Sequence, residues 1–381
     1  MKIGIITFHI SNNYGALLQT YALQHKLELL GQSVEVIDYR PTPRSEKLEL
    51  IHRIPKYKPS QNLLRYLLAI PYRFCMDILT LNKRHQLRAY ILQYIKKHYH
   101  LSEKQYVSYS ELEKSCPHYD LYLVGSDQVW NPHNTGGDFD PAYFFSYIKE
   151  EHACASYASS VGRYNIRDNA DTFRNYSQNL HWVSVREAQT IPAIKEITGK
   201  DAVCVVDPTL LLTADDWKQI TLEQKKHPEK FILVYSLGSN QSVGKVAKMI
   251  STNLKLPIMY IRYDSEPLKS QPSFVRPEEY LWCFAHASFV ITDSFHGTVF
   301  SIINSKPFYT VQPEINNSRV LNLLTQLGIA DRYIPPEKIP TVNNNIDYNH
   351  VQDKLERMRH DSLDYLNTVI REREEYLTCQ Q

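Results

Sequence analysis

The sequence predicts an α/β protein with parallel sheets in two domains, and three observations support this prediction. The chain has 381 residues, which is long for one core and fits two domains of common size. Short apolar runs that fit strands alternate with longer runs of helical period, the pattern of βαβ units. Three strand candidates lead directly into polar loops, where open parallel sheets bind ligands.

The first half opens with a strand, a helix and a second strand. Lys2–Thr7 is an apolar run of strand-forming residues, Gly15 opens a helical pattern, and Gly31 fits its end. Ser33–Tyr39 fits the second strand, so this opening is a βαβ unit. Later strand candidates in this half are Tyr119–Val124, Ala153–Ala158, Trp182–Val185 and Val203–Val206. We expect the first domain to cover residues 1–210.

The second half repeats the same alternation. Its strand candidates are Phe231–Tyr235, Ile258–Ile261, Phe289–Thr292 and, as the last, Pro307–Val311. A helix fits 243–254, and Pro277 followed by two glutamates fits the first turn of another. We expect the second domain at 211–345. The charged tail, 346–381, is helical in pattern, and the sequence leaves open whether it packs back on the first domain.

Residues 41–104 are strongly basic. They contain 13 Lys or Arg and four Asp or Glu, a net charge of +9 within a chain of net charge +2. Prolines interrupt the first part and helical periodicity follows, so we predict a basic helical insertion at about 41–115. A solvated helical face and a surface that meets anionic lipid or a lipid diphosphate both fit this charge. The near-neutral whole chain does not indicate nucleic-acid binding.

The remaining composition indicates a cytoplasmic protein. The six cysteines are scattered, without the spacing of a zinc site or a disulfide framework. The apolar start, residues 1–8, fits a strand better than a signal peptide. The sequence contains no run of about 18 apolar residues that would form a spanning helix. We therefore expect membrane contact, where it occurs, to be peripheral and at the inner face.

The loop after the first strand is the first candidate binding loop. It contains Asn13, Tyr14 and Gly15. Glycine lets a backbone approach a ligand closely, and the following helix N-terminus offers free N–H groups to an anion. A plain structural turn fits these residues equally well.

The loop Gly125–Pro132 is the second candidate. Asp127 is placed to accept a proton from a hydroxyl, while Gln128, Trp130 and Asn131 are residue types that bind sugars. In the alternative interpretation, the aspartate caps the loop and the tryptophan packs in the core.

The third loop, Asp293–Thr298, places His296 and Gly297 at the start of a helix. Such a site binds phosphate or carboxylate through N–H groups and a charged imidazole. Arg186 also follows a strand end and suits capture of an anion, although an interdomain salt bridge fits it as well. Arg319, at another helix start, is a weaker candidate of the same kind.

Five segments in this order resemble the polysaccharide pyruvyl transferase family. They are Ile3–Leu30, Val124–Pro132, Val183–Glu187, Val206–Leu210 and Ile291–Thr298. The resemblance covers roughly residues 1–330. It implies two Rossmann-like domains that face each other across a cleft, similar to the GT-B glycosyltransferases, with the basic helical insertion in the first domain.

The resemblance also implies an activity, in which the pyruvate of phosphoenolpyruvate is joined as a ketal to two hydroxyls of one sugar. Family members modify surface-polysaccharide precursors, and a polyprenyl-diphosphate-linked sugar is one form of acceptor. His296 and Arg186 match residues associated with the donor, and we expect them to hold or protonate it. We expect Ser294, Gly297, Thr298 and Arg319 on the donor side, in the second domain. In the first domain, on the acceptor side, we expect Asp127 as the catalytic group at the acceptor hydroxyl. The residues expected to bind the acceptor are Asn13, Tyr14, Gly15, Gln128, Trp130 and Asn131. The scheme needs no metal and no cofactor besides the co-substrate.

The chain departs from the family pattern at one position. Better-understood members carry Arg-Leu-His where this chain has Ser294, Phe295 and His296. The resemblance therefore implies that the donor loses one cationic partner, which Arg319, Arg262 or Arg276 would have to replace. A nucleotide-sugar glycosyltransferase on a similar scaffold and a non-catalytic carbohydrate-binding or assembly protein are the alternative functions.

Overall fold

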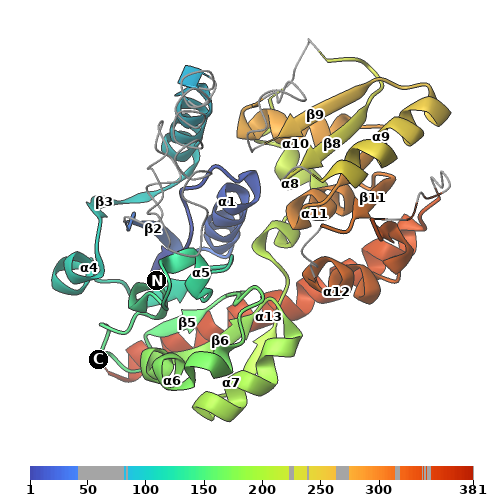
Figure 1. The fold of residues 1–381 in the computed structure, drawn as a ribbon. Coiled ribbons are helices and arrows are strands. Elements are labelled where there is room, and N and C mark those ends of the chain that lie inside the picture. The colour runs from blue at the N-terminus through green and yellow to red at the C-terminus, as the bar shows by residue number, and fades with distance from the viewer. Residues whose placement is uncertain are drawn as a thin grey trace, which may run out of the picture.

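The computed structural model describes residues 1–41, 81–82, 85–222, 227–237, 240–262, 274–313, 318–336, 338, 340 and 345–380. Two parallel sheets organise these residues, one in each half of the chain (Figure 1). Helices pack against both sheets, so the predicted α/β fold with two Rossmann-like halves is confirmed.

The first sheet has the strand order β3-β2-β1-β4-β5-β6-β7, and all its pairings are parallel. Its strands are β1 (Lys2–Ile6), β2 (Ser33–Tyr39), β3 (Leu101–Tyr106), β4 (Leu121–Val124), β5 (Cys154–Ser156), β6 (Leu180–Val185) and β7 (Ala202–Cys204). The labelled helices of this half are α1 (Tyr14–Leu29), α4 (Tyr109–Ser115), α5 (Pro132–Thr135), α6 (Ala170–Tyr176) and α7 (Ile191–Thr198). Gly31, with φ +82°, follows the end of α1 as predicted.

The basic insertion differs in part from its prediction. Residues 42–80 and 83–84 lie outside the described residues, while 85–98 form a helix with Leu87, Ile91, Tyr94 and Ile95 buried. The prediction that the insertion is helical throughout is wrong for β3, which pairs with β2 at the edge of the sheet. Its exposed, mostly charged middle residues suit an edge strand, because charge discourages pairing with another chain.

The second sheet has the order β12-β11-β10-β8-β9, again all parallel. Its strands are β8 (Ile232–Ser236), β9 (Ile258–Arg262), β10 (Phe289–Thr292), β11 (Phe308–Val311) and β12 (Tyr333–Ile334). The helices are α8 (Ala214–Lys218), α9 (Gln241–Leu254), α10 (Pro277–His286), α11 (Phe295–Ile303) and α12 (Ser318–Leu327). The predicted last strand of this sheet is β11, and β12 was not predicted because a two-residue strand has no readable period.

The two halves share one hydrophobic cluster. It contains Leu17 and Tyr21 from α1 together with Leu233 from β8 and Phe300 from α11. The Tyr14 hydroxyl donates to the carbonyl of Val275 at 2.8 Å across the boundary. Apolar and polar contacts therefore both fix the halves against each other.

The C-terminal helix, α13 (Tyr348–Cys379), contacts both halves (Figure 1). Gln352 Nε2 donates to the carbonyl of Ile302 at 3.3 Å in the second half, whereas Arg373 Nε donates to the carbonyl of Asp120 at 2.6 Å in the first. Within the described residues, no helix has the length and apolar character needed to cross a membrane.

Candidate active site

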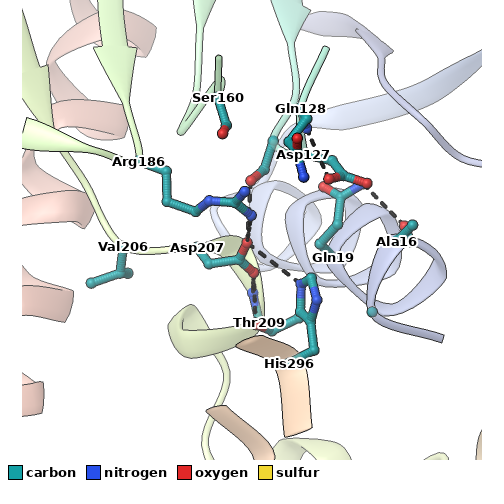
Figure 2. A network of polar contacts seen from close by, with 12 residues as sticks. Ala16, Gln19, Asp127, Gln128, Ser160, Arg186, Val206, Asp207, Thr209 and His296 are labelled. Carbon is teal, nitrogen blue, oxygen red and sulfur yellow. Dashed lines mark hydrogen bonds and ion pairs between the residues drawn. The ribbon is translucent and has the colours of Figure 1, made fainter. Parts of the chain in front are cut away.

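A buried aspartate joins the two halves where the strands of the first sheet end. Asp207, three residues after β7, accepts a hydrogen bond from Arg186 Nη1 at 2.8 Å through its Oδ2 (Figure 2). The same oxygen lies 3.6 Å from His296 Nε2, in the first turn of α11. Thr209 Oγ1 donates to the other oxygen at 2.7 Å. Asp207 thus connects a cation of the first half with an imidazole of the second.

The environment of Asp207 keeps it ionised. Burial acts to raise its pKa, but the neighbouring His296 and Arg186, with the hydrogen bond from Thr209, hold the pKa well below its usual range. Ser126 Oγ adds a hydrogen bond to Oδ2 at 3.2 Å. A negative charge therefore lies between the guanidinium of Arg186 and the imidazole of His296.

Arg186 is a buried cation with one uncommitted nitrogen. Its side chain is 4% exposed, and Nε donates to Glu187 Oε1 at 3.2 Å. Burial opposes its charge, but Glu187 and Asp207 raise its pKa above the usual value. The remaining nitrogen, Nη2, is buried without a hydrogen-bond partner among the described residues. Because buried donors are rarely left unpaired, this nitrogen marks a place for a ligand acceptor.

His296 packs directly on Gly15 of α1. A Cβ atom at position 15 would lie 2.0 Å from His296 Nδ1, so a glycine is required there. Gly15 was expected to let a ligand approach the backbone, and the imidazole of His296 lies in that place. Asn13 caps α1, because its Oδ1 accepts the N–H of Gly15 at 3.0 Å.

The start of α11 uses its polar side chains for its own geometry. Ser294 Oγ accepts the N–H of Gly297 at 3.4 Å. Thr298 Oγ1 donates to the carbonyl of Ser294 at 2.9 Å and contacts Thr310 Oγ1 at 2.7 Å. Thr298 is fully buried and its hydroxyl bonds within the second half, so its predicted place at the donor stays a prediction. The N–H groups of Phe295 and His296 lie in the first turn, where the helix offers no acceptor.

Asp127 lies near the buried guanidinium of Arg186, as expected for a catalytic group of the same site. Its charge is among those that raise the pKa of Arg186. Its φ of +76° is unusual for a residue other than glycine, and such strain is common at functional sites. Asp127 Oδ1 accepts the N–H of Gln128 at 2.8 Å, while Gln128 Oε1 accepts from Asn131 Nδ2 at 2.8 Å. Asp127, Arg186 and His296 therefore come together.

Two residues predicted to bind the acceptor lie in the protein interior instead. Trp130 is 0% exposed, its Nε1 donates to the carbonyl of Tyr143 at 2.8 Å, and its ring stacks on Phe144. The predicted sugar-stacking wall is therefore wrong for Trp130. Tyr14 is equally buried and stacks on Tyr280 at 4.8 Å, so its ring joins the halves.

A cavity of about 330 Å³ adjoins this network. Arg186 and Asp207 line it together with Phe295 and Arg319, whereas Asp127 and His296 are not among its lining residues. The guanidinium carbons of Arg186 and Arg319 lie 5.0 and 5.8 Å from the centre of the Phe295 ring. Burial and the nearby Arg186 lower the pKa of Arg319 to about 10, which leaves it protonated at neutral pH.

The three arginines expected to compensate for Ser294 have different positions. Arg319 is at the cavity, as that expectation requires. Arg276 is not, because its Nη1 donates to Gln93 Oε1 at 2.8 Å and its guanidinium lies over Tyr90. The side chain of Arg262 lies outside the described residues.

Asp207 and Glu187 are site residues that were not predicted from the sequence. Both follow strand ends beside Arg186, and Asp207 lies in a segment that carried the family resemblance. Their position after strand ends could have marked both as site candidates. The pairing of Arg186 with Asp207, 21 residues away, could not be predicted from the sequence because it depends on the fold. Among the described residues, no group of three His, Cys, Asp or Glu side chains is placed to hold a metal ion.

Comparison with known proteins gives one family match. A family model described as polysaccharide pyruvyl transferase matches residues 13–314, which include Asp127, Arg186 and His296. None of the curated proteins compared with the chain matches it.

Several solved structures resemble the chain over most of its length. A UDP-GlcNAc 2-epimerase from Neisseria meningitidis is 9% identical with a TM-score of 0.44, covering 97% of this chain and 94% of its own. A UDP-GlcNAc 2-epimerase from Methanocaldococcus jannaschii is 12% identical with a TM-score of 0.43, covering 94% and 93%. An E. coli heptosyltransferase is 10% identical with a TM-score of 0.39, covering 94% and 99%.

Proposed function

The chain belongs to the polysaccharide pyruvyl transferase family, and from that premise we propose that it transfers pyruvate from phosphoenolpyruvate to two hydroxyls of one sugar. The product is a cyclic ketal of the sugar, and inorganic phosphate leaves. The acceptor we propose is a precursor of a surface polysaccharide, carried on polyprenyl diphosphate or free.

The uncommitted nitrogen of Arg186 is the observation that carries this proposal. Phosphoenolpyruvate has a carboxylate and a phosphate, so its site needs fixed cations and N–H donors. Arg186 Nη2 is buried without a partner among the described residues, and Arg319 lines the same cavity. The two cations therefore fit a small anion between the halves. A cavity of about 330 Å³ suits a small ligand.

The reaction requires a proton donor at the donor methylene carbon and a base at the sugar hydroxyls. Protonation of the methylene makes C2 open to attack by the first hydroxyl, and the second hydroxyl then displaces phosphate. Two carbon–oxygen bonds form at C2, while its carbon–carbon double bond becomes a single bond and its bond to the phosphate oxygen breaks. Of the two hydroxyl protons released, one balances the proton on the new methyl group and the other leaves with phosphate.

We assign roles to three residues, of which Arg186 lines the cavity, whereas His296 contacts the lining residue Asp207 and Asp127 lies near Arg186. Arg186 binds the donor anion through Nη2. His296, oriented by Asp207 at 3.6 Å and by Gly15, protonates the methylene carbon. Asp127, whose Oδ1 accepts the N–H of Gln128, receives the hydroxyl proton. Asp207 acts as a positioning residue, because its Oδ2 contacts both Arg186 and His296.

The test combines phosphate release with detection of the product. The purified protein is incubated with phosphoenolpyruvate and a panel of sugar diols, and phosphate release and the new ketal methyl resonance are measured. We expect both to depend on the acceptor and to be lost in His296→Ala without loss of fold. Wild-type turnover in that variant would remove His296 from the mechanism. Stabilisation by a nucleotide sugar, with none by phosphoenolpyruvate, would overturn the proposed donor.

A further inference from the structure

The cavity beside Arg186 extends beyond the segment that matches the family. That match ends at residue 314, whereas α12 and α13, which begin at residues 318 and 348, supply part of the cavity wall. Lys354 and Arg357 line the cavity from α13. They are three residues apart on one helix, a spacing that places both side chains on the same face.

These two cations differ from the buried arginines of the same helix. Arg359 Nε donates to the carbonyl of Leu210 at 2.5 Å, and Arg373 donates to the carbonyl of Asp120. By contrast, Lys354 is half-buried and Arg357 is exposed, and neither forms an ion pair within the described residues. Arg359 and Arg373 therefore use their donors on backbone carbonyls, whereas the donors of Lys354 and Arg357 are available to a ligand.

Three acidic residues line the cavity. Glu187 and Asp207 pair with Arg186, whereas Asp361 lies on α13 itself, four residues after Arg357, and is exposed. Arg186 Nη2 provides a further donor for a ligand, since it is buried without a partner among the described residues. The cavity is therefore built to receive an anion that reaches from Arg186 toward α13.

We propose that Lys354 and Arg357 form the phosphate subsite for the donor, with Arg186 and Arg319 at its carboxylate end. This assignment rests on the proposed function. A lysine suits phosphate as a compact point charge, and an arginine provides further donors. Because Arg357 is exposed, the released phosphate has a route to solvent beside α13.

Contacts of neighbouring residues hold the backbone of α13 in place beside the cavity. Arg359 fixes the helix to the connection between the halves, and Ser362 Oγ accepts the N–H of Val206 at 3.0 Å, next to Asp207. The backbone that carries Lys354 and Arg357 is therefore fixed relative to Asp207 and Arg186. A rigid support is what ligand recognition requires, because an anion site that is loosely held loses affinity.

The experiment compares two double variants with the same loss of charge. Lys354→Gln/Arg357→Gln removes the subsite, and Lys248→Gln/Arg371→Gln removes two exposed cations of α9 and α13 that do not line the cavity. Calorimetry measures the Kd of each protein for phosphoenolpyruvate, inorganic phosphate and pyruvate. We expect the subsite variant to bind phosphoenolpyruvate and phosphate about tenfold or more weakly, with pyruvate affinity changed less than about twofold.

The outcomes separate this inference from the proposed function. Unchanged phosphoenolpyruvate affinity in the subsite variant, or equal weakening in both variants, would overturn the subsite and leave the proposed donor standing. If the wild type binds phosphate but not phosphoenolpyruvate, and the subsite variant loses phosphate, the anion site stands and the proposed donor fails. Absence of binding to all three ligands would overturn both.

Discussion

Replacement of Asp207 by asparagine tests how the two halves are joined at the site. The change keeps the shape of the side chain and leaves an oxygen for the hydrogen bond from Thr209. It removes the negative charge that lies 2.8 Å from Arg186 Nη1 and 3.6 Å from His296 Nε2. Arg186 then retains Glu187 as its counter-charge, at 3.2 Å.

The structure sets the size of the expected loss. Removing one partner of a buried ion pair destabilises a protein by about 3–5 kcal/mol, and we expect about 3 kcal/mol because Glu187 remains. The pKa of Asp207 is held below its usual range, so its contribution is complete above about pH 5. That contribution falls as the pH drops toward the folded-state pKa. The stability difference between wild type and variant should therefore shrink in acid.

Urea unfolding measures this difference in unfolding free energy as a shift in the midpoint of the first unfolding transition. Asp201→Asn is the matched control, because it removes the same charge from a pair with Lys195 at 2.7 Å in which Asp201 is 91% exposed. We expect the control to unfold like the wild type. A buried-site variant that unfolds like its control, or a difference that grows in acid, would refute the assignment of Asp207 as the charged link.

Three further substitutions test individual parts of the site. Gly15→Ala places a methyl group 2.0 Å from His296 Nδ1, so turnover should fall about a hundredfold through misplacement of the imidazole, and unchanged turnover would contradict this contact. Trp130→Ala should lower the unfolding free energy by about 3–5 kcal/mol without raising the acceptor KM, because the ring is buried; the reverse pattern would restore its predicted sugar-binding role. Arg319→Met should weaken phosphoenolpyruvate binding about tenfold in calorimetry, whereas Arg276→Met should not; equal effects would remove Arg319 from the cavity's function.

Local sequence patterns were sufficient for most of the fold. Ser33–Tyr39 and Phe289–Thr292 have the strand bounds that the sequence predicts. Phe289–Thr292 is a short, nearly continuous apolar run, the pattern of a buried parallel strand, and Ser33–Tyr39 is a run rich in Val, Ile and Tyr that includes two acidic residues. The edge strand β3 was missed since its exposed, mostly charged middle gives no apolar run. Its pairing with β2 is a tertiary contact that local periodicity does not report.

The site was predictable in position and only partly in role. Arg186, Asp127 and His296 follow strand ends, and parallel strands place such residues at one edge. The sequence did not predict which side chains point into the protein interior. Trp130 follows a strand end, which suggested a sugar-stacking role, but its ring stacks on Phe144. The contact of Gly15 with His296 joins residues 281 positions apart, so it depends on how the halves are packed.

Calorimetric titration of phosphoenolpyruvate into the wild type and Arg186→Lys tests the central claim most directly. The lysine keeps the charge but lacks the planar fork whose Nη2 is unpartnered among the described residues. Arg167→Lys, in an exposed pair with Glu196 at 2.6 Å, is the matched control. We predict binding to the wild type and control and at least about tenfold weaker binding to Arg186→Lys. Equal binding to all three proteins, or none to the wild type, would contradict the claim that Arg186 holds the donor.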